Sequence, residues 1–264
     1  MKAKSGVLVL LLAIGAANVR ASDDSTVEAV DDYVRRFLNK RHIPGASVAV
    51  VRDGAVVLAK GYGLANVECN APATEHTVYQ LASVTKQFTA TAVMLLVRDG
   101  SLTLDDKIGD RLPDLPSAWK DVTVRQLLNH TSGIKSYTSV DNFHELARKD
   151  FKPREILDLV AGAPLEFAPG EKMNYSNTGY FLLGLLIEKA SGRPYGEFLA
   201  DRVFKPLGMA DTRVNDLRAI VPNRAQGYQW DGVVLKNGEY VSPTQPFAAG
   251  MLRSTVADLV QWDA

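Results

Sequence analysis

The chain has 264 residues, of which 46% are hydrophobic and 23% are charged, as is usual for a globular protein with a sizeable core. Lysine and arginine together number 30, aspartate and glutamate together also number 30, and no run of one charge stands out. The charge balance therefore gives no reason to expect nucleic acid or an anionic membrane as a partner, and it favours a small or uncharged one.

The N-terminus has the composition of a secretory signal peptide. Lys2 and Lys4 precede an almost wholly apolar stretch over residues 6–17, and Val19 and Ala21 are small residues at the spacing of a cleavage site. The alternative, a membrane anchor, needs about 20 apolar residues, and this stretch is shorter. We predict a signal peptide at residues 1–21, one mature domain at residues 22–264, a periplasmic or secreted location and no stable membrane anchor.

The mature chain is expected to open with a helix and a β-hairpin. Ser25 and Glu28 form a capping-box pattern ahead of apolar residues at helical spacing. Two β-rich runs, 46–51 and 55–58, are joined at Asp53-Gly54, a strong signal for a tight hairpin turn. Because the first run is apolar on both faces, we expect a sheet that is covered on both sides and has further strands.

The rest of the chain is expected to be mainly helical. Helices are predicted over residues 83–99, after Thr123, over 179–190 and over 195–204, and the third is apolar nearly all round and hence buried. Asn237-Gly238 predicts a further small hairpin. Cys69 is the only cysteine, so the chain can form no internal disulfide, and we interpret it as an ordinary thiol.

The pattern Ser-x-x-Lys places a hydroxyl and an amine on one face of a helix, one turn apart. A lysine whose pKa is lowered by desolvation can take the serine proton, and the positive end of the helix favours the charge that develops as the hydroxyl attacks a carbonyl. The pattern occurs in this chain at Ser83 and Lys86, at Ser117 and Lys120, and at Ser132 and Lys135.

The surroundings of the three serines differ. Ser83 precedes a long apolar helix, whereas Ser117 lies in a stretch without helical periodicity and Ser132 precedes Gly133 at a helix end. The alternative for Ser83 is a helix cap with Lys86 on a solvated face, because serine is common at helix starts. From position alone, both interpretations of Ser83 stay open.

A second candidate constellation is Tyr175-Ser176-Asn177, which precedes the predicted buried helix. A phenol near ammonium groups can exchange protons with the serine and with a leaving group, and the Asn177 carboxamide can donate to a substrate carbonyl. The alternative is a tyrosine packed at a helix start with the asparagine as its cap.

Taken together, the motifs resemble the serine β-lactamase and penicillin-binding superfamily, in particular its branch of class C β-lactamases, esterases and D-alanyl peptidases. The resemblance rests on Ser83-Val84-Thr85-Lys86, His130-Thr131-Ser132-Gly133, Tyr175-Ser176-Asn177, Pro206-Leu207-Gly208-Met209, Gln226-Gly227-Tyr228 and residues 250–258.

The resemblance implies an α+β fold of the β-lactamase/transpeptidase type. One lobe would be an antiparallel sheet flanked by helices, the other would be helical, and the active site would lie between them. The resemblance further implies that Ser83 is the nucleophile, Lys86 its activator, Tyr175 the acid/base and Asn177 a substrate contact. Glu166 receives no role, because the middle motif is of the tyrosine type. We interpret His130 as a structural residue at a helix end.

Family members also carry a third motif on a strand that lines the site, a Lys or His followed by a small residue and Gly. We find no such triplet after Tyr175, and the sequence ends at Ala264, in a helix that Thr255 and Asp258 are expected to cap. We therefore expect the C-terminal strands of the sheet to be missing, and residues 22–264 alone to be poorly soluble or molten and hydrolytically inactive.

The sequence also bears on other classes of protein. A non-catalytic remnant or gene fragment of such an enzyme shares every motif. The four histidines form no metal-ligand spacing, Gly61-Tyr62-Gly63 lacks the third glycine of a nucleotide site, and no Gly-x-Ser-x-Gly elbow is present. We predict a serine acyl hydrolase without metal or cofactor, monomeric when intact. Its substrate would be a β-lactam, a D-alanyl or other peptidoglycan-like peptide, a small ester or an amide, and the fold does not choose among them.

Overall fold

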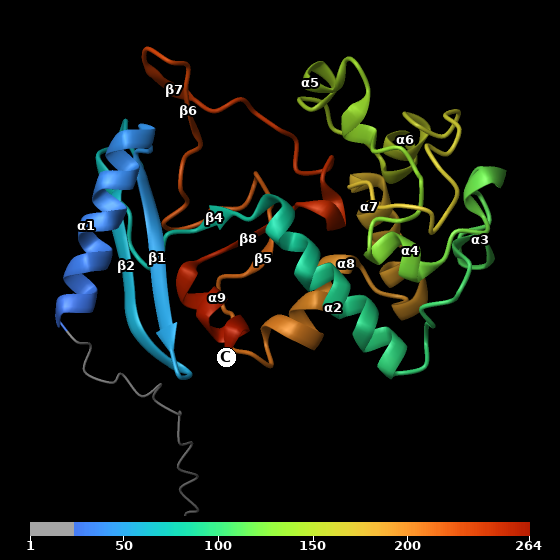
Figure 1. Ribbon diagram of the computed structural model, residues 1–264, viewed down its shortest axis with the longest axis horizontal. Coiled ribbons are helices and arrows are strands. Elements are labelled where there is room, and N and C mark those ends of the chain that lie inside the picture. Colours follow the sequence, from blue (N-terminus) through green and yellow to red (C-terminus); the bar gives the residue numbers. More distant parts are fainter. Residues whose placement is uncertain (1–23) are drawn as a thin grey trace, which may run out of the picture.

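The computed structural model describes residues 24–264, and the predicted signal peptide therefore lies outside the described residues. Figure 1 shows two lobes side by side, one built on the long strands β1 and β2 and the other on helices, with α2 (Thr85–Arg98) beginning between them. The two-lobed α+β architecture implied by the motifs is confirmed.

The first lobe contains a three-stranded antiparallel sheet in the order β1-β2-β3. Its strands are β1 (Gly45–Arg52), β2 (Ala55–Asn66) and β3 (Ala71–Pro72). Asp53 and Gly54 join β1 to β2, and their φ angles of 51° and 73° give the tight turn that the sequence predicts.

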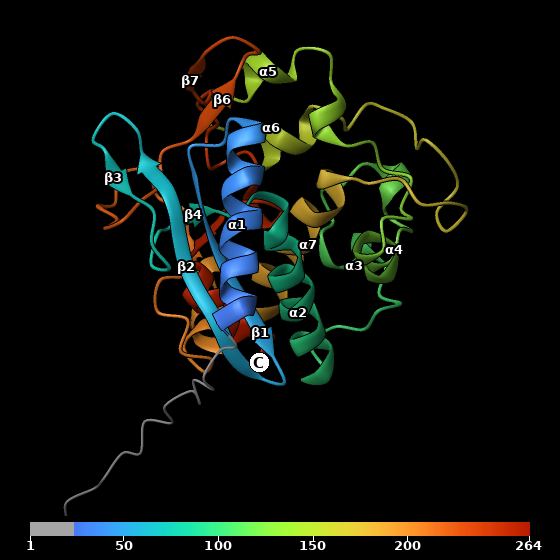
Figure 2. The ribbon, with the colours of Figure 1, turned by 60° about the vertical axis from the view of Figure 1, so that its left-hand side comes forward.

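Helices lie on both sides of this sheet (Figures 1 and 2). The N-terminal helix α1 (Asp24–Arg41) covers one side, and α9 (Val256–Asp263) lies beside β1 on the other. Asp31 of α1 accepts hydrogen bonds from Lys60 Nζ at 2.6 Å and Tyr62 OH at 2.7 Å, both on β2. The predicted sheet with cover on both sides is thereby confirmed.

A second small sheet joins the two lobes. Its order is β4-β8-β5, formed by β4 (Tyr79–Gln80), β8 (Leu252–Ser254) and β5 (Arg213–Val214). Because β4 precedes the helical lobe in the chain and β5 and β8 follow it, this sheet holds distant segments together. The amide of Leu81, which follows β4, donates to Leu252 O at 2.8 Å.

The predicted hairpin near Asn237-Gly238 exists, but its turn was placed wrongly. Strands β6 (Tyr228–Trp230) and β7 (Leu235–Asn237) pair antiparallel, so Asn237 ends the hairpin instead of forming its turn. The turn begins at Asp231, whose carboxylate accepts from the amides of Val233 and Val234. An aspartate that binds the backbone two and three residues ahead stabilises a turn without the Asn-Gly pair.

The remaining helices of the described chain form the second lobe. They are α2, α3 (Ile108–Arg111), α4 (Val124–Leu128), α5 (Phe143–Leu146), α6 (Pro153–Asp158), α7 (Asn177–Ser191), α8 (Tyr195–Leu199) and the π-helical turn η4 (Ala200–Phe204) that continues it. Four 3-10 turns accompany them: η1 (Ala82–Val84), η2 (Ser117–Trp119), η3 (Tyr137–Ser139) and η5 (Phe247–Ala249).

The main hydrophobic core lies between α2 and α7. Phe88, Ala92 and Val93 of α2 and Leu182 and Leu183 of α7 are completely buried. The helix predicted to be apolar nearly all round is α7, and it ends at Gly192, whose φ of 69° is the left-handed cap that glycine favours. The burial of α7 is therefore confirmed.

Two predicted helix starts differ in detail. Ser25 lies inside α1, which begins at Asp24. Thr255 caps α9 as predicted, accepting from the Asp258 amide at 3.0 Å. The Asp258 carboxylate does not complete a capping box, because it accepts from the Asp211 amide and the Thr212 hydroxyl. Within residues 24–264, no helix combines the length and apolar character needed to cross a membrane.

Candidate active site

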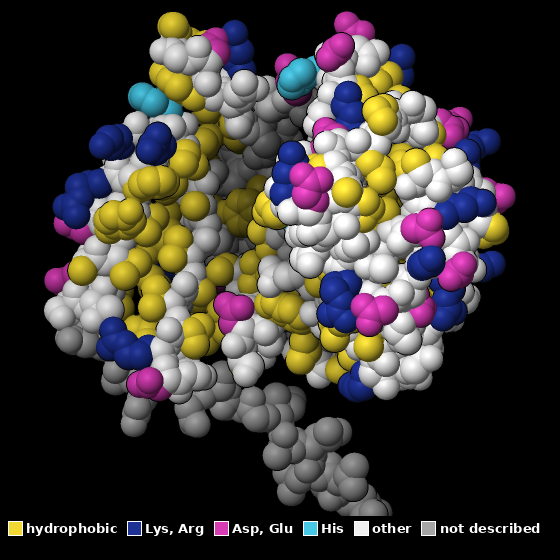
Figure 3. Space-filling view, turned by 45° about the vertical axis from the view of Figure 1, so that its right-hand side comes forward, with side chains coloured by type: hydrophobic (Ala, Val, Ile, Leu, Met, Phe, Trp, Pro, Cys, Tyr) yellow, Lys and Arg dark blue, Asp and Glu magenta, His cyan; other side chains and the backbone are white. Residues whose placement is uncertain are grey.

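Ser83 lies just before α2, the helix that begins between the lobes (Figure 1), and Figure 3 shows the surface hollowed between these lobes. It belongs to the 3-10 turn η1 and not, as predicted, to the α-helix, which begins at Thr85. Its hydroxyl caps neither helix, so the interpretation of Ser83 as a simple helix cap is wrong. Ala82 has a φ of 45°, a costly backbone conformation for a residue with a side chain, at the turn that presents Ser83 to solvent.

Lys86 is buried beneath Ser83, with 7% of its surface exposed. Its Nζ donates to Ser83 Oγ at 3.2 Å, to Asn177 Oδ1 at 2.9 Å and to the carbonyl of Ala249 at 2.7 Å. These acceptors use all three ammonium protons. Burial lowers the pKa of Lys86, and the nearby Tyr175 phenol opposes that shift. The amine is thus easier to deprotonate than a solvated lysine.

Tyr175 also contacts Ser83. Its phenol donates to Ser83 Oγ at 2.8 Å, while 44% of the residue remains exposed. The Lys86 ammonium also lies 4.8 Å from the centre of the Tyr175 ring, within the range of a cation–π interaction. The Ser83 oxygen therefore contacts two groups that are able to carry its proton. Both Ser83 and Tyr175 are also exposed to solvent.

Asn177 is fixed at both ends of its carboxamide. Its Oδ1 accepts from Lys86, and its Nδ2 donates to Thr138 Oγ1 at 3.1 Å. Its backbone amide donates to Ser136 Oγ, also at 3.1 Å. One Nδ2 proton has no partner in these bonds, so the predicted contact with a substrate carbonyl stays a prediction. Ser136 and Thr138 were missed from the sequence, because nothing in their local pattern points to residue 177.

The segment that contains η5 and β8 is hydrogen-bonded to the first turns of α2, the helix that carries Lys86. Besides the Ala249 carbonyl on Lys86, the Ala248 carbonyl accepts from Thr89 Oγ1 of α2 at 2.7 Å. The amide of Leu252 donates to Thr85 Oγ1 at 3.2 Å. Ala249, just before the motif at residues 250–258, thus binds the Lys86 ammonium.

The other two Ser-x-x-Lys patterns form no comparable site. Ser117 lies in the turn η2, and only the backbones of Ser117 and Lys120 are hydrogen-bonded. Ser132 is buried, and its hydroxyl accepts from the Ile134 amide. Glu166 accepts a hydrogen bond from Asn174 Nδ2 at 2.7 Å. Among the described residues, no group of His, Cys, Asp and Glu is arranged to hold a metal ion.

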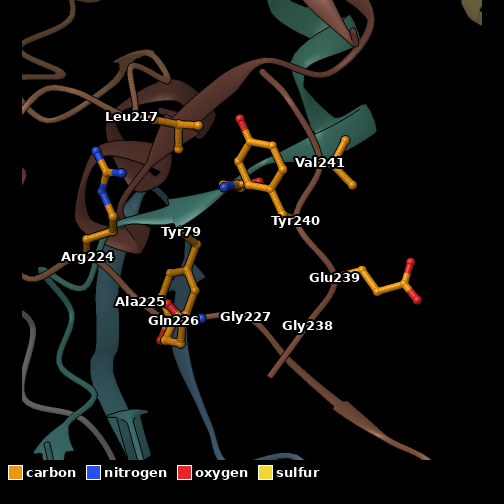
Figure 4. Close-up of a pocket in the computed structure, with 11 residues that line it drawn as sticks. Tyr79, Leu217, Arg224, Ala225, Gln226, Gly227, Gly238, Glu239, Tyr240 and Val241 are labelled. Carbon is orange, nitrogen blue, oxygen red and sulfur yellow. The ribbon is translucent and has the colours of Figure 1, made fainter. Parts of the chain in front are cut away.

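A cavity of about 420 Å³ lies along β4, the strand that leads toward Ser83 (Figure 4). Its wall comes from three segments: β4, residues 217–227 and residues 238–241. Arg224 on this wall donates to the carbonyls of Asp216 and Ala219, which fixes its guanidinium. Tyr79 is fixed by a 2.9 Å hydrogen bond between its phenol and Ser47 Oγ. Tyr240 on the opposite wall is half exposed.

Comparison with known proteins agrees with this geometry. The profile of the Beta-lactamase family matches residues 30–264. "Protein flp" of Staphylococcus aureus (strain MW2) is 34% identical over 250 residues, which cover 92% of this chain and 49% of that protein. This chain therefore spans about half the length of the curated relatives it matches first.

Solved structures are similar as well. The octameric penicillin-binding protein homologue from Pyrococcus abyssi superposes with a TM-score of 0.77 and 33% identity, covering 89% of this chain and 55% of that one. The D-amino acid amidase from Ochrobactrum anthropi SV3 superposes with a TM-score of 0.78 and 33% identity, covering 90% and 68%. With the Ser83, Lys86 and Tyr175 geometry, these matches show that the chain belongs to the serine β-lactamase and penicillin-binding protein superfamily.

Proposed function

We propose that this protein is a serine acyl hydrolase in which Ser83 forms an acyl-enzyme with an amide or peptide of a D-amino acid. The observation that carries the proposal is the pair of hydrogen bonds on Ser83 Oγ, one from Lys86 Nζ and one from the Tyr175 phenol. A nucleophile within hydrogen-bond reach of its base, with that base oriented by further groups, is the arrangement that nucleophilic catalysis requires.

In the acylation step, the Ser83 hydroxyl attacks the substrate carbonyl carbon and its proton passes to the neutral form of Lys86. The burial that lowers the pKa of Lys86 increases the fraction of that form near neutral pH. A proton then passes through the Tyr175 phenol to the leaving nitrogen as the carbon–nitrogen bond breaks. Water attacks the resulting ester and releases the acid, which restores the Ser83 hydroxyl.

The substrate class rests on similarity and on the shape of the site. One similar solved structure is a D-amino acid amidase, and Tyr175 is exposed enough to meet a substrate. Balanced surface charge gives no reason to expect a highly charged substrate. β-Lactams and small esters offer the same reactive carbonyl, so we propose them as alternative acylating agents of Ser83.

Adduct mapping tests the proposal. A form of the protein that also carries the family's third motif is incubated with a fluorophosphonate or a penicillin, and the modified residue is identified by mass spectrometry. We expect one adduct, on Ser83, that Ser83→Ala abolishes and the exposed-residue control Ser117→Ala leaves unchanged. Lys86→Met and Tyr175→Phe are expected to slow labelling about a hundredfold or more, since proton transfer contributes at least that much. An adduct on another serine, or undiminished labelling of both variants, contradicts the assignment.

Turnover separates the substrate classes. The amides of D- and L-alanine are offered to the same preparation, with a chromogenic β-lactam and a short ester in parallel. We expect hydrolysis of the D-amide and none of the L-amide. Adduct formation on Ser83 without any turnover would identify an acylatable protein that is not a hydrolase.

We also propose that the protein is exported, on the composition of residues 1–21. Expression of the whole chain in a Gram-negative host is expected to give a periplasmic or secreted product that begins at Ser22, as read by N-terminal sequencing. A cytoplasmic product that retains Met1 would contradict export.

A further inference from the structure

His130 does more in this structure than end a helix. It follows α4 with a φ of 60°, a left-handed conformation that glycine or asparagine normally takes at a helix end. Such a conformation costs free energy for a histidine and persists only where the surroundings impose it. The contacts of His130 with the residues around Tyr175 account for that cost.

Three contacts of His130 hold Tyr175. The His130 carbonyl accepts from the Asn174 amide at 2.9 Å, and its Nδ1 accepts from the Ser176 amide at 3.2 Å. The residues immediately before and after Tyr175 are therefore both bound to His130. The imidazole also lies against the Tyr175 ring, with 4.5 Å between ring centres and 32° between planes.

Tyr180 of α7 also lies against the imidazole, at 5.0 Å between ring centres and 33° between planes. Tyr180 is itself anchored, since its phenol donates to the carbonyl of Leu128 at 3.0 Å. The ring contacts of His130 with Tyr175 and Tyr180 thus connect the phenol that contacts Ser83 to the buried helix α7.

The hydrogen bond from Ser176 requires a neutral imidazole with an unprotonated Nδ1. The charged and titratable groups that face His130 are Lys86 from α2, Tyr175 from the preceding loop and Tyr180 from α7. Burial lowers the pKa of His130 and the Lys86 charge lowers it further, so both keep the imidazole neutral. A protonated ring would place a second cation beside Lys86 and turn an N–H toward the Ser176 amide.

We infer that His130 is a positioning residue that holds the Tyr175 phenol against Ser83, through its carbonyl, its unprotonated Nδ1 and the contact of its ring with the Tyr175 ring. This role deepens the proposed function and rests on it, because the positioned group is the proposed acid/base. The residue acts only through Tyr175 and touches neither Ser83 nor a substrate.

Two variants and a double-mutant cycle test the inference. His130→Phe keeps a ring but loses Nδ1, whereas His130→Asn keeps the preference for a left-handed backbone but loses the ring. The control is His144→Phe, at an exposed position of α5. We expect each His130 variant to label Ser83 with a fluorophosphonate about fivefold to tenfold more slowly, as the loss of one hydrogen bond or one aromatic pair predicts. The control is expected to label at the normal rate.

The same substitutions in the Tyr175→Phe background decide whether His130 acts through the phenol. Because the phenol is absent there, His130→Phe is expected to cause no further loss. An equal loss in both backgrounds would overturn the inference, since it would show a general structural role.

Nitrogen NMR gives a readout that does not depend on reactivity. We expect the His130 ring to have an unprotonated Nδ1 and to remain neutral at about pH 6.5, where a free histidine is half protonated. A protonated Nδ1 at that pH would overturn the inference. If wild-type Ser83 does not label at all, the proposed function fails, while the NMR result still decides the state of His130.

Discussion

Substituting Gly184 by alanine tests whether the packing of α7 against η5 sets the position of Lys86, the proposed base. A β-carbon at residue 184 would lie 2.5 Å from Ala248 Cβ and 2.5 Å from Phe247 Cε1. Ordinary contacts begin at 3.4 Å, so the helix and η5 must separate by about 1 Å. The Phe247 ring has little freedom to move, because it packs on Phe181 and Tyr195 at 5.1 and 5.3 Å between ring centres.

The magnitude follows from two opposing effects. Overfilling a packed core lowers the free energy of unfolding by about 1–3 kcal/mol, and replacing glycine by alanine inside a helix raises it by about 1 kcal/mol. The expected net loss of stability is about 1 kcal/mol, which lowers the melting midpoint by about 3 °C in a chain of this size. Because η5 carries the Ala249 carbonyl that binds Lys86, a shift of about half an ångström is also expected to slow acylation of Ser83 about tenfold.

The assay is differential scanning calorimetry together with the rate of fluorophosphonate labelling. Gly179→Ala is the matched control on the same helix, since its β-carbon would meet nothing closer than Leu127 O at 3.6 Å. That variant is expected to keep or raise stability, by at most about 1 kcal/mol, and to label normally. If Gly184→Ala melts with or above Gly179→Ala and labels at the same rate, the packing argument is refuted.

Three further predictions concern single side chains. The rate of Ser83 labelling should rise with pH through a midpoint below 10.5, because the lowered pKa of Lys86 makes its neutral amine available at lower pH. A stopped-flow pH profile with a midpoint at or above 10.5 would count against Lys86 as the base. Thr89→Val should lower the free energy of unfolding by about 1–3 kcal/mol, because the buried Ala248 carbonyl and the Tyr195 phenol both lose the Thr89 hydroxyl as a hydrogen-bond partner. Thr89→Ser keeps the hydroxyl and should melt like the wild type. Equal melting temperatures of the two variants would contradict this prediction. Arg253→Met should leave the free energy of unfolding unchanged or raise it, because Arg253 is buried with two nitrogens that have no hydrogen-bond partner. Burial and two neighbouring arginines also lower the pKa of Arg253. A clear loss of stability in a denaturant titration would disprove this expectation.

Much of the local structure could be predicted from the sequence, because its causes lie within a few residues. The Asp53-Gly54 turn follows from two residues that tolerate positive φ. The start of α4 follows from Thr123 and Gln126, whose side chains and amides bond reciprocally in a capping box. Where two local solutions exist, as at the β6–β7 turn, the sequence pattern pointed to the wrong residues.

The sequence by itself also made Ser83, Lys86 and Tyr175 the candidate catalytic residues, since each lies in a motif that resembles those of a known family. Tertiary structure alone decided what fixes them: the Ala249 carbonyl on Lys86, Thr138 on Asn177 and His130 around Tyr175. These contacts join residues between 39 and 163 positions apart in the chain. Periodicity and capping report only on neighbours within a turn or a strand. A backbone carbonyl or a stacked ring at such a separation becomes a partner only when the packed core brings the two segments together.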